Sequence, residues 1–185
     1  MKNGIVWVIV ALALVASGRE ALYAQAPEAQ LGPVIQNYGP VFDVLGIDVA
    51  APTDHEYKVV FDVSQGGTEP EALNRYIVTV ARFLNMHARA GVPVENMHLA
   101  IVLHGSAAKA ALSHEAYRER YEIDNPNFEL VAALREAGVR IYLCGQSAMS
   151  RGFMKEDLAP SVDLALSAMT MMVLLQDEGY RLHGI

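Results

Sequence analysis

Cys144 is the only cysteine in the 185-residue chain, and its place in the sequence suits a reactive thiol. It follows residues 139–143, an apolar stretch that predicts a short buried strand, and it precedes residues 145–147, which turn the chain toward a helix. The carboxyl end of a parallel strand faces the crevice where α/β proteins usually hold ligands. Since one cysteine cannot close a disulfide within the chain, Cys144 serves packing, an intermolecular bond, metal binding or thiol chemistry.

Four side chains could turn this thiol into a nucleophile. Ser147 is the predicted N-cap of the following helix, and the unpaired N–H groups at such a helix start would stabilise a thiolate. Arg151, one turn further on, and Lys109 could add positive charge at the same edge. The amide of Gln146 could bind an anionic sulfur species. Together these groups would lower the pKa of the Cys144 thiol and activate it.

His104 is the second candidate for chemistry. It follows residues 97–103, the second predicted strand, and the ends of neighbouring parallel strands can lie together at one edge of a sheet. We therefore predict that Cys144 and His104 are the catalytic residues. The residues predicted to bind the substrate are Gly145, Gln146, Ser147 and Arg151.

Each of these residues also has a purely structural interpretation. Cys144 could be a small buried apolar residue, His104 a structural histidine, and Arg151 a solvated or ion-paired helix residue. Gly66-Gly67 could cradle a phosphate before a helix, but Rossmann and P-loop spacings are missing from the sequence. The other five histidines show no metal-ligand spacing. We therefore predict neither a metal site nor a cofactor.

The elements expected to position these residues alternate between strand and helix. Residues 25–55 carry loop signals and predict an extended arm that packs on the domain or on a neighbouring subunit. The predicted strands are 57–63, 97–103, 139–143 and 162–166, with a last short strand after Gly179. The predicted helices are one from the N-cap Thr68 to Gly91, with Glu71 completing a capping box, and then 107–112, 113–121, 127–137, 147–153 and 168–178. This order predicts a three-layer α/β/α sandwich with a mainly parallel sheet.

The first residues of the chain predict a secretory signal peptide over residues 1–24. Lys2 gives the positive start, residues 5–16 are almost wholly apolar, and small residues follow at Ala24 and Ala26. Cleavage is expected after Ala24, with cleavage after Ala26 as the alternative. The mature protein would then be periplasmic or secreted, a compartment in which an unpaired thiol is conspicuous.

An uncleaved membrane anchor is the other interpretation of residues 1–24. Arg19 and Glu20 favour it, because they interrupt the sequence between the apolar run and the cleavage site. The apolar run itself is too short for a comfortable membrane span, which needs about 20 residues. After cleavage we expect no contact with a membrane.

Charge and hydropathy restrict the classes of partner. The chain has a formal net charge of −7 and no basic cluster, which makes nucleic acid and anionic membrane surfaces improbable partners. The Met-rich stretch 168–175 is apolar on nearly every side. Since a helix that is apolar all round is normally buried, an interface between copies of the chain would account for it in a domain of this size.

The sequence resembles the DsrE/DsrF-like family, and more narrowly its exported branch. The resemblance covers residues 32–183, arm included, and places the α/β domain at residues 56–185. The segments that carry it are 57–63, 98–105, 125–127, 141–147 and 166–180, of which the strand ending in Cys144-Gly145-Gln146-Ser147 is the most specific.

The resemblance implies a fold, an assembly and a chemistry. It implies a five-stranded, mainly parallel sheet and a homo-trimer or homo-hexamer with the cysteine near a subunit interface. Relatives carry sulfur as a persulfide on this cysteine and pass it between partners, which assigns sulfur carriage to Cys144. This chain departs from them in its export signal, which argues against tRNA thiolation, and in lacking a second cysteine that could resolve its persulfide.

Three functions remain open at this point. The first is a sulfur carrier or sulfurtransferase that passes sulfane sulfur from Cys144 to a partner thiol, the donor and acceptor proteins being unknown. The second is an oligomeric binding or scaffold protein in which Cys144 is structural. The third, a binder of a small molecule or nucleotide at the sheet edge, rests on fold analogy alone.

Overall fold

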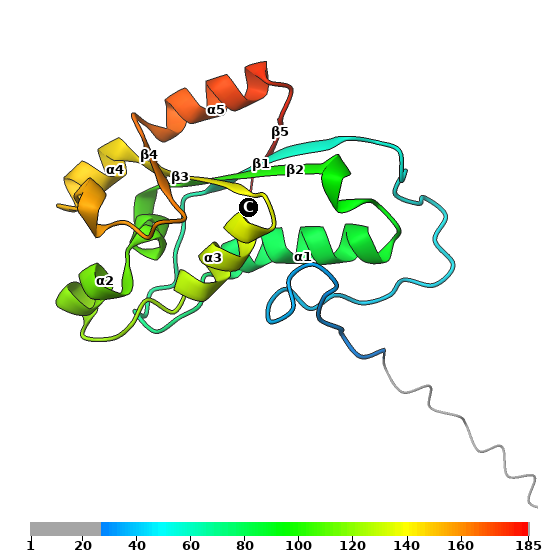
Figure 1. Ribbon diagram of the computed structural model, residues 1–185, viewed down its shortest axis with the longest axis horizontal. Helices are drawn as coiled ribbons and strands as arrows, with labels where there is room; N and C mark the ends of the chain where they lie inside the picture. Colours follow the sequence, from blue (N-terminus) through cyan, green and yellow to red (C-terminus); the bar gives the residue numbers. More distant parts are fainter. Residues whose placement is uncertain (1–26, 185) are drawn as a thin grey trace, which may run out of the picture.

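The computed structural model describes residues 27–184, which form a five-stranded sheet with helices on both faces (Figure 1). The predicted signal peptide, residues 1–24, lies outside the described residues. Every strand pair is parallel, and the strand order is β4-β3-β2-β1-β5. The strands are β1 (Tyr57–Val63), β2 (Met97–Leu103), β3 (Arg140–Cys144), β4 (Asp163–Ala165) and β5 (Arg181–Gly184). This arrangement confirms the predicted α/β sandwich with a five-stranded parallel sheet.

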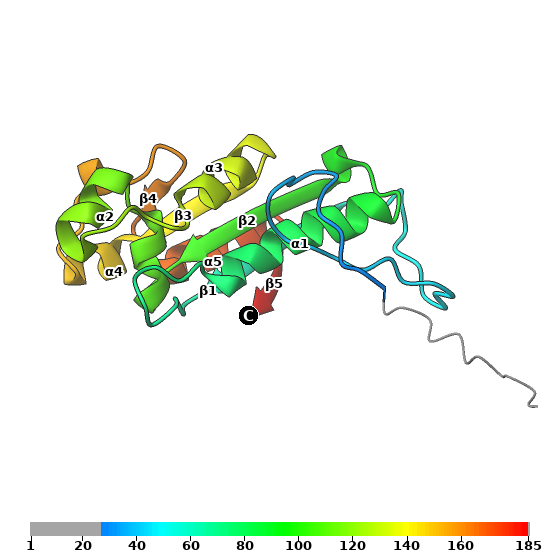
Figure 2. The same cartoon turned by 90° about the horizontal axis from the view of Figure 1, so that it is seen from below.

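The helices divide between the two faces and the carboxyl edge of the sheet. Helices α1 (Arg75–Arg89) and α3 (Phe128–Glu136) cover one face, and α5 (Ala168–Asp177) covers the other (Figures 1 and 2). Helices α2 (His114–Tyr121) and α4 (Gly145–Ser150) lie at the end of the sheet where β2 and β3 finish. Short 3₁₀ turns span Val94–Asn96, Gly105–Ala111 and Lys155–Asp157. Among the helices of residues 27–184, none has the length and apolar character to cross a membrane.

The alternation of side chains along the strands defines two cores. In the central strand β2, Leu99, Ile101 and Leu103 point toward α1 and α3 and join the larger apolar cluster. Ala100 and Val102 point the other way and pack against α5 in a smaller cluster. Because both faces are covered, the strand reads as a continuous apolar run, as buried parallel strands do.

The first helix begins later than the sequence predicts. Its N-cap is Asn74, whose side chain accepts a hydrogen bond from the Tyr76 N–H at 2.9 Å, so the predicted N-cap Thr68 is wrong. Asn74 is buried, and Asn127 Oδ1 accepts a hydrogen bond from its backbone N–H at 2.7 Å. This contact across 53 residues fixes the helix start by tertiary packing, which a local capping pattern does not reveal.

The arm is anchored on α1 by one buried amide. Asn85 accepts hydrogen bonds from the Val34 and Ile35 N–H groups at 3.2 and 2.8 Å. Its Nδ2 lies 3.0 Å from the carbonyl oxygens of Ile35, Tyr38 and Gly39. The first half of the arm therefore packs on its own domain. Its next residues carry exposed apolar side chains, which are Phe42, Val44, Leu45, Ile47 and Val49.

Replacing Asn85 should release the arm. We expect Asn85→Ala to lower the free energy of unfolding by at least about 2 kcal/mol, because buried backbone groups lose their partners. Urea denaturation measures this change. Asn96→Ala is the matched control, since Asn96 makes one exposed hydrogen bond to the arm at Thr53 O and should change stability by less than about 0.5 kcal/mol. Equal effects of the two substitutions would contradict the anchoring role.

Candidate functional site

The candidate site lies at the carboxyl ends of the three central strands. Asp62 is near the end of β1, His104 directly follows β2, and Cys144 ends β3. The strand order places these three ends side by side. The β2–β3 register pairs Leu103 with Leu143, so His104 and Cys144 stand one step beyond that pair on adjacent strands.

These three side chains share the face of the sheet that α5 covers. Val60, Val102 and Tyr142 all pack in the smaller cluster with α5. Asp62, His104 and Cys144 each come two residues after one of them, and side chains two apart in a strand point to the same face. The backbone of His104 is extended, so the alternation continues past the end of β2.

N–H groups and one hydroxyl around Cys144 lower the pKa of its thiol. Burial raises the pKa of the thiol, but hydrogen bonds from the backbone of Ser147, Ala168 and Gln146 and from the Ser147 hydroxyl outweigh it, so the pKa lies below the usual 9.0. Each of these donors interacts more strongly with a thiolate than with a thiol. The site therefore favours the nucleophilic form of the cysteine.

Two helix starts converge on this sulfur. Cys144 occupies the N-cap position of α4, and Gln146 and Ser147 supply N–H groups from its first turn. Ala168 is the first residue of α5, whose N-cap is Ser167. The predicted N-cap Ser147 of α4 is wrong, because this helix begins at Gly145. The start of α5 at Ala168 is found as predicted, but its place beside Cys144 depends on the fold and was not predicted.

Ser147 links the sulfur to the end of β2. Its Oγ accepts a hydrogen bond from the Gly105 N–H at 3.1 Å, which leaves the hydroxyl proton for the sulfur. Gly105 has a φ of +51°, and a Cβ there would lie 2.5 Å from Ser64 O. Only glycine fits this conformation and this close approach. The glycine thus holds the donor that orients Ser147.

The other residues predicted to bind substrate occupy different places. A Cβ on Gly145 would lie 2.6 Å from Ala165 O, so this glycine lets β4 pass close to the start of α4. Gln146 turns its side-chain amide toward Leu166 O at 3.5 Å and contributes its backbone N–H to the sulfur. Arg151 lies at the C-cap of α4, the helix end away from the sulfur, where it donates to Ser150 Oγ at 3.3 Å.

Lys109 is also held elsewhere. Its ammonium donates to Glu69 O at 3.2 Å and lies 5.8 Å from the centre of the Tyr121 ring. The site therefore stabilises a thiolate with oriented N–H groups of the backbone, and the two cations proposed from the sequence are engaged by other partners.

His104 is hydrogen-bonded to Asp62, a residue that the sequence analysis did not single out. Its Nε2 lies 2.6 Å from Asp62 Oδ1, and both side chains are partly exposed. The available signal was a carboxylate within the apolar run of β1, between the buried Phe61 and Val63. A charge in such a place calls for a partner.

Access to the sulfur is narrow. Cys144 is 5% exposed, so the sulfur lies just beneath the surface. The elements around it carry exposed apolar side chains, namely Met149 on α4, Met169 on α5 and Leu166 just before α5. A small sulfur compound or a partner with an apolar contact surface suits this setting.

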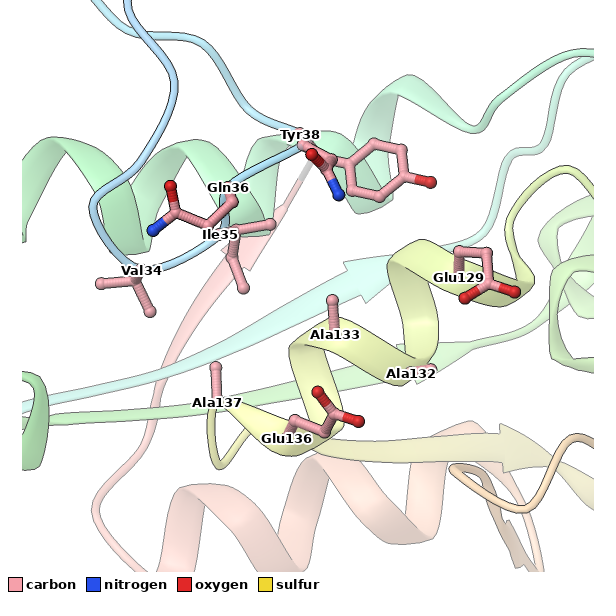
Figure 3. A pocket seen from close by; sticks show the side chains of 10 residues that line it. Val34, Ile35, Gln36, Tyr38, Glu129, Ala132, Ala133, Glu136 and Ala137 are labelled. Carbon is pink, nitrogen blue, oxygen red and sulfur yellow. The ribbon is translucent and has the colours of Figure 1, made fainter.

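A cleft of about 530 Å³ lies away from this site. It runs between the arm residues 34–38 and helix α3, and the carboxylates of Glu129 and Glu136 stand on its α3 wall (Figure 3). Helix α3 covers the face of the sheet opposite to α5, so the cleft does not open onto Cys144. Within residues 27–184, no group of three or more His, Cys, Asp or Glu side chains could hold a metal ion.

The fold and the site together define an α/β/α protein with one thiolate-stabilising cysteine at the carboxyl edge of a parallel sheet. The chain belongs to the DsrE/DsrF-like family, whose model matches residues 58–182. This family is linked in general to sulfur relay. The arm before residue 58 lies outside the matched region. A comparison with curated proteins gives no significant match.

Two solved structures share the fold. MTH1491 from Methanobacterium thermoautotrophicum, a protein of unknown function, is 20% identical with a TM-score of 0.52. The YchN protein from E. coli is 16% identical with a TM-score of 0.51. Each match covers 70% of this chain and 99% of the solved chain. At these identities the likeness concerns the fold.

The Ser147 hydroxyl should contribute measurably to thiolate stability. We expect Ser147→Ala to raise the pKa of Cys144, because the sulfur loses one hydrogen bond while the backbone donors remain. The rate of iodoacetamide alkylation as a function of pH reports this pKa, and its midpoint should move upward. Ser150→Ala is the control, since Ser150 Oγ donates to Ser147 O and not to the sulfur. Unchanged midpoints in both variants would refute the role of the hydroxyl.

Proposed function

We propose that this protein is an exported sulfur carrier that holds sulfane sulfur as a persulfide on Cys144 and passes it to a partner thiol. The observation that carries the proposal is the meeting of two helix starts at one sulfur, which lowers the pKa of the Cys144 thiol. Membership of a family linked to sulfur relay supports it. The exported location rests on the sequence of residues 1–24, and a cleaved N-terminus in the periplasmic fraction would test it.

Sulfur loading requires a nucleophile and a leaving group. The Cys144 thiolate attacks the terminal sulfur of a donor persulfide, so that a new S–S bond forms on Cys144 while the donor's S–S bond breaks and the donor leaves as a thiolate. The exchange involves no net oxidation or reduction, so it needs no oxidant. Unloading is the same exchange with an acceptor thiolate attacking the outer sulfur.

The N–H groups around Cys144 suit the loaded state as well. A persulfide is an anion when deprotonated, and N–H groups at the starts of α4 and α5 stabilise negative charge. The chain has one cysteine, so the persulfide has no thiol of its own chain to form a disulfide with. A sulfur carrier must keep its persulfide intact until a partner thiol binds, and the lack of a second cysteine serves this purpose.

Mass spectrometry tests the proposal directly. Protein incubated with polysulfide, or with thiosulfate and a sulfurtransferase, should gain the mass of one or more sulfur atoms on Cys144, and dithiothreitol should remove them. Cys144→Ser should gain nothing, because its hydroxyl is a poor nucleophile at neutral pH. Absence of an adduct on the wild-type protein, under conditions that load a known carrier, would overturn the proposal.

A scaffold role is the second candidate, favoured by the exposed apolar surface of α5. Of the helix, Leu175 is fully buried, whereas Met169, Val173 and Leu174 are exposed in the single chain. We propose that a homo-oligomer, a trimer or hexamer, covers this surface. Such an assembly is compatible with sulfur carriage and becomes the whole function if Cys144 proves unreactive.

Charge placed on this helix should disrupt the assembly. We expect Val173→Glu to shift the protein toward monomer in analytical ultracentrifugation, because a buried carboxylate without a partner is costly. Asn37→Glu adds the same charge at an exposed position of the arm beside α3, on the opposite face of the sheet, and should leave the mass unchanged. A wild-type protein that sediments as a monomer would contradict the proposed oligomer.

A further inference from the structure

Asp62 is a carboxylate that the proposed sulfur exchange does not yet use. It lies within β1 between two fully buried apolar residues, Phe61 and Val63. On its own face of the sheet it follows Val60, which packs against α5. The Asp62 side chain is itself partly exposed on that face, where it can be paired and hydrogen-bonded.

The pairing of Asp62 is specific. Its Oδ1 lies 2.6 Å from His104 Nε2, and an ionised carboxylate only accepts hydrogen bonds. The imidazole therefore carries a proton on Nε2. When the ring is neutral, the lone pair and the basicity lie on Nδ1. Within residues 27–184, the His104 ring makes one hydrogen bond, which is the bond to Asp62.

The same histidine stands beside the cysteine. One step beyond the Leu103–Leu143 pair, His104 and Cys144 occupy equivalent positions on adjacent strands, which lie about 4.8 Å apart in a sheet. Both point to the α5 face, so Asp62, His104 and Cys144 follow one another across the ends of three neighbouring strands. In this order the thiol can act as the nucleophile, the imidazole as its acid or base, and the carboxylate as the group that orients the imidazole.

We propose that Asp62 is the positioning residue that holds His104 as the proton carrier for sulfur transfer at Cys144, an inference that rests on the function proposed above. Asp62 acts through the imidazole, which it orients by the hydrogen bond to Nε2. His104 is the residue that exchanges a proton with the reacting sulfur compounds.

The proton movements balance over one loading event. The Cys144 thiolate attacks the terminal sulfur of a donor persulfide, and the electron pair of the breaking S–S bond goes to the donor's inner sulfur. Nδ1 of the neutral His104 ring takes the proton that the transferred sulfur carries, and gives it to the donor's inner sulfur, which leaves as a neutral thiol. The histidine ends as it began, and the net change is transfer of one sulfur atom.

Two reactions of the same thiol separate this role from a structural one. Alkylation by iodoacetamide expels iodide, which needs no proton, whereas transfer from glutathione persulfide expels a thiolate, which does. We expect Asp62→Asn to lower the transfer rate by at least about tenfold while alkylation changes less than about twofold. Asp62→Glu should recover part of the transfer rate. Equal losses in both reactions, or no loss in either, would overturn the proposal.

The tautomer of His104 gives an independent readout. In ¹⁵N-histidine-labelled protein, the neutral ring should be protonated on Nε2 in the wild type, and Asp62→Asn should shift it toward a mixture of tautomers. A wild-type ring protonated on Nδ1 would overturn the proposal. Asp163→Asn is the matched control, because Asp163 is a carboxylate on β4 of the same sheet, paired with Arg135, and should leave both rates and the tautomer unchanged.

The two proposals fail in different ways. If the wild-type protein takes up no sulfur on Cys144, the carrier function fails and the positioning role falls with it. If the protein loads normally and Asp62→Asn transfers sulfur as fast as the wild type, only the positioning role fails. A double variant with His104→Gln should transfer no more slowly than His104→Gln alone, since Asp62 acts through that ring.

Discussion

The stabilisation of the Cys144 thiolate by N–H groups at the starts of α4 and α5 is the interaction on which the site depends. The first turn of any helix leaves N–H groups without partners, and here two such turns meet at one atom. The topology makes this possible, since β3 runs directly into α4 and the β4–α5 connection returns to the same edge. Gly145 permits the return, because any larger residue would collide with Ala165 O.

Two opposing effects act on the pKa of the Cys144 thiol, and their balance decides how much of it is thiolate. Burial disfavours the charged sulfur, while the oriented N–H groups favour it and prevail. The thiol is largely buried, and exposed apolar side chains surround it. The N–H groups that stabilise the thiolate would also stabilise a persulfide anion.

Part of this arrangement could be predicted from the sequence, and the rest depends on tertiary contacts. The strands at 57–63 and 97–103 are found as predicted, because short runs of β-branched and apolar residues rarely form anything other than a buried strand. The place of Cys144 at a strand end follows from the same pattern. The partnership of Asp62 with His104 and the donor at Ala168 join segments tens of residues apart, and only the order of strands in the sheet brings them together.

The pKa of Cys144 in the wild-type protein tests the account most directly. A ¹³Cβ chemical-shift titration of cysteine-labelled protein follows the single thiol without chemical modification. We expect one transition with a midpoint below the ordinary value of 9.0, since the effect of the N–H groups outweighs that of burial. A midpoint at or above 9.0 would show that burial prevails, and Cys144 would then be a packing residue and not a carrier of sulfur.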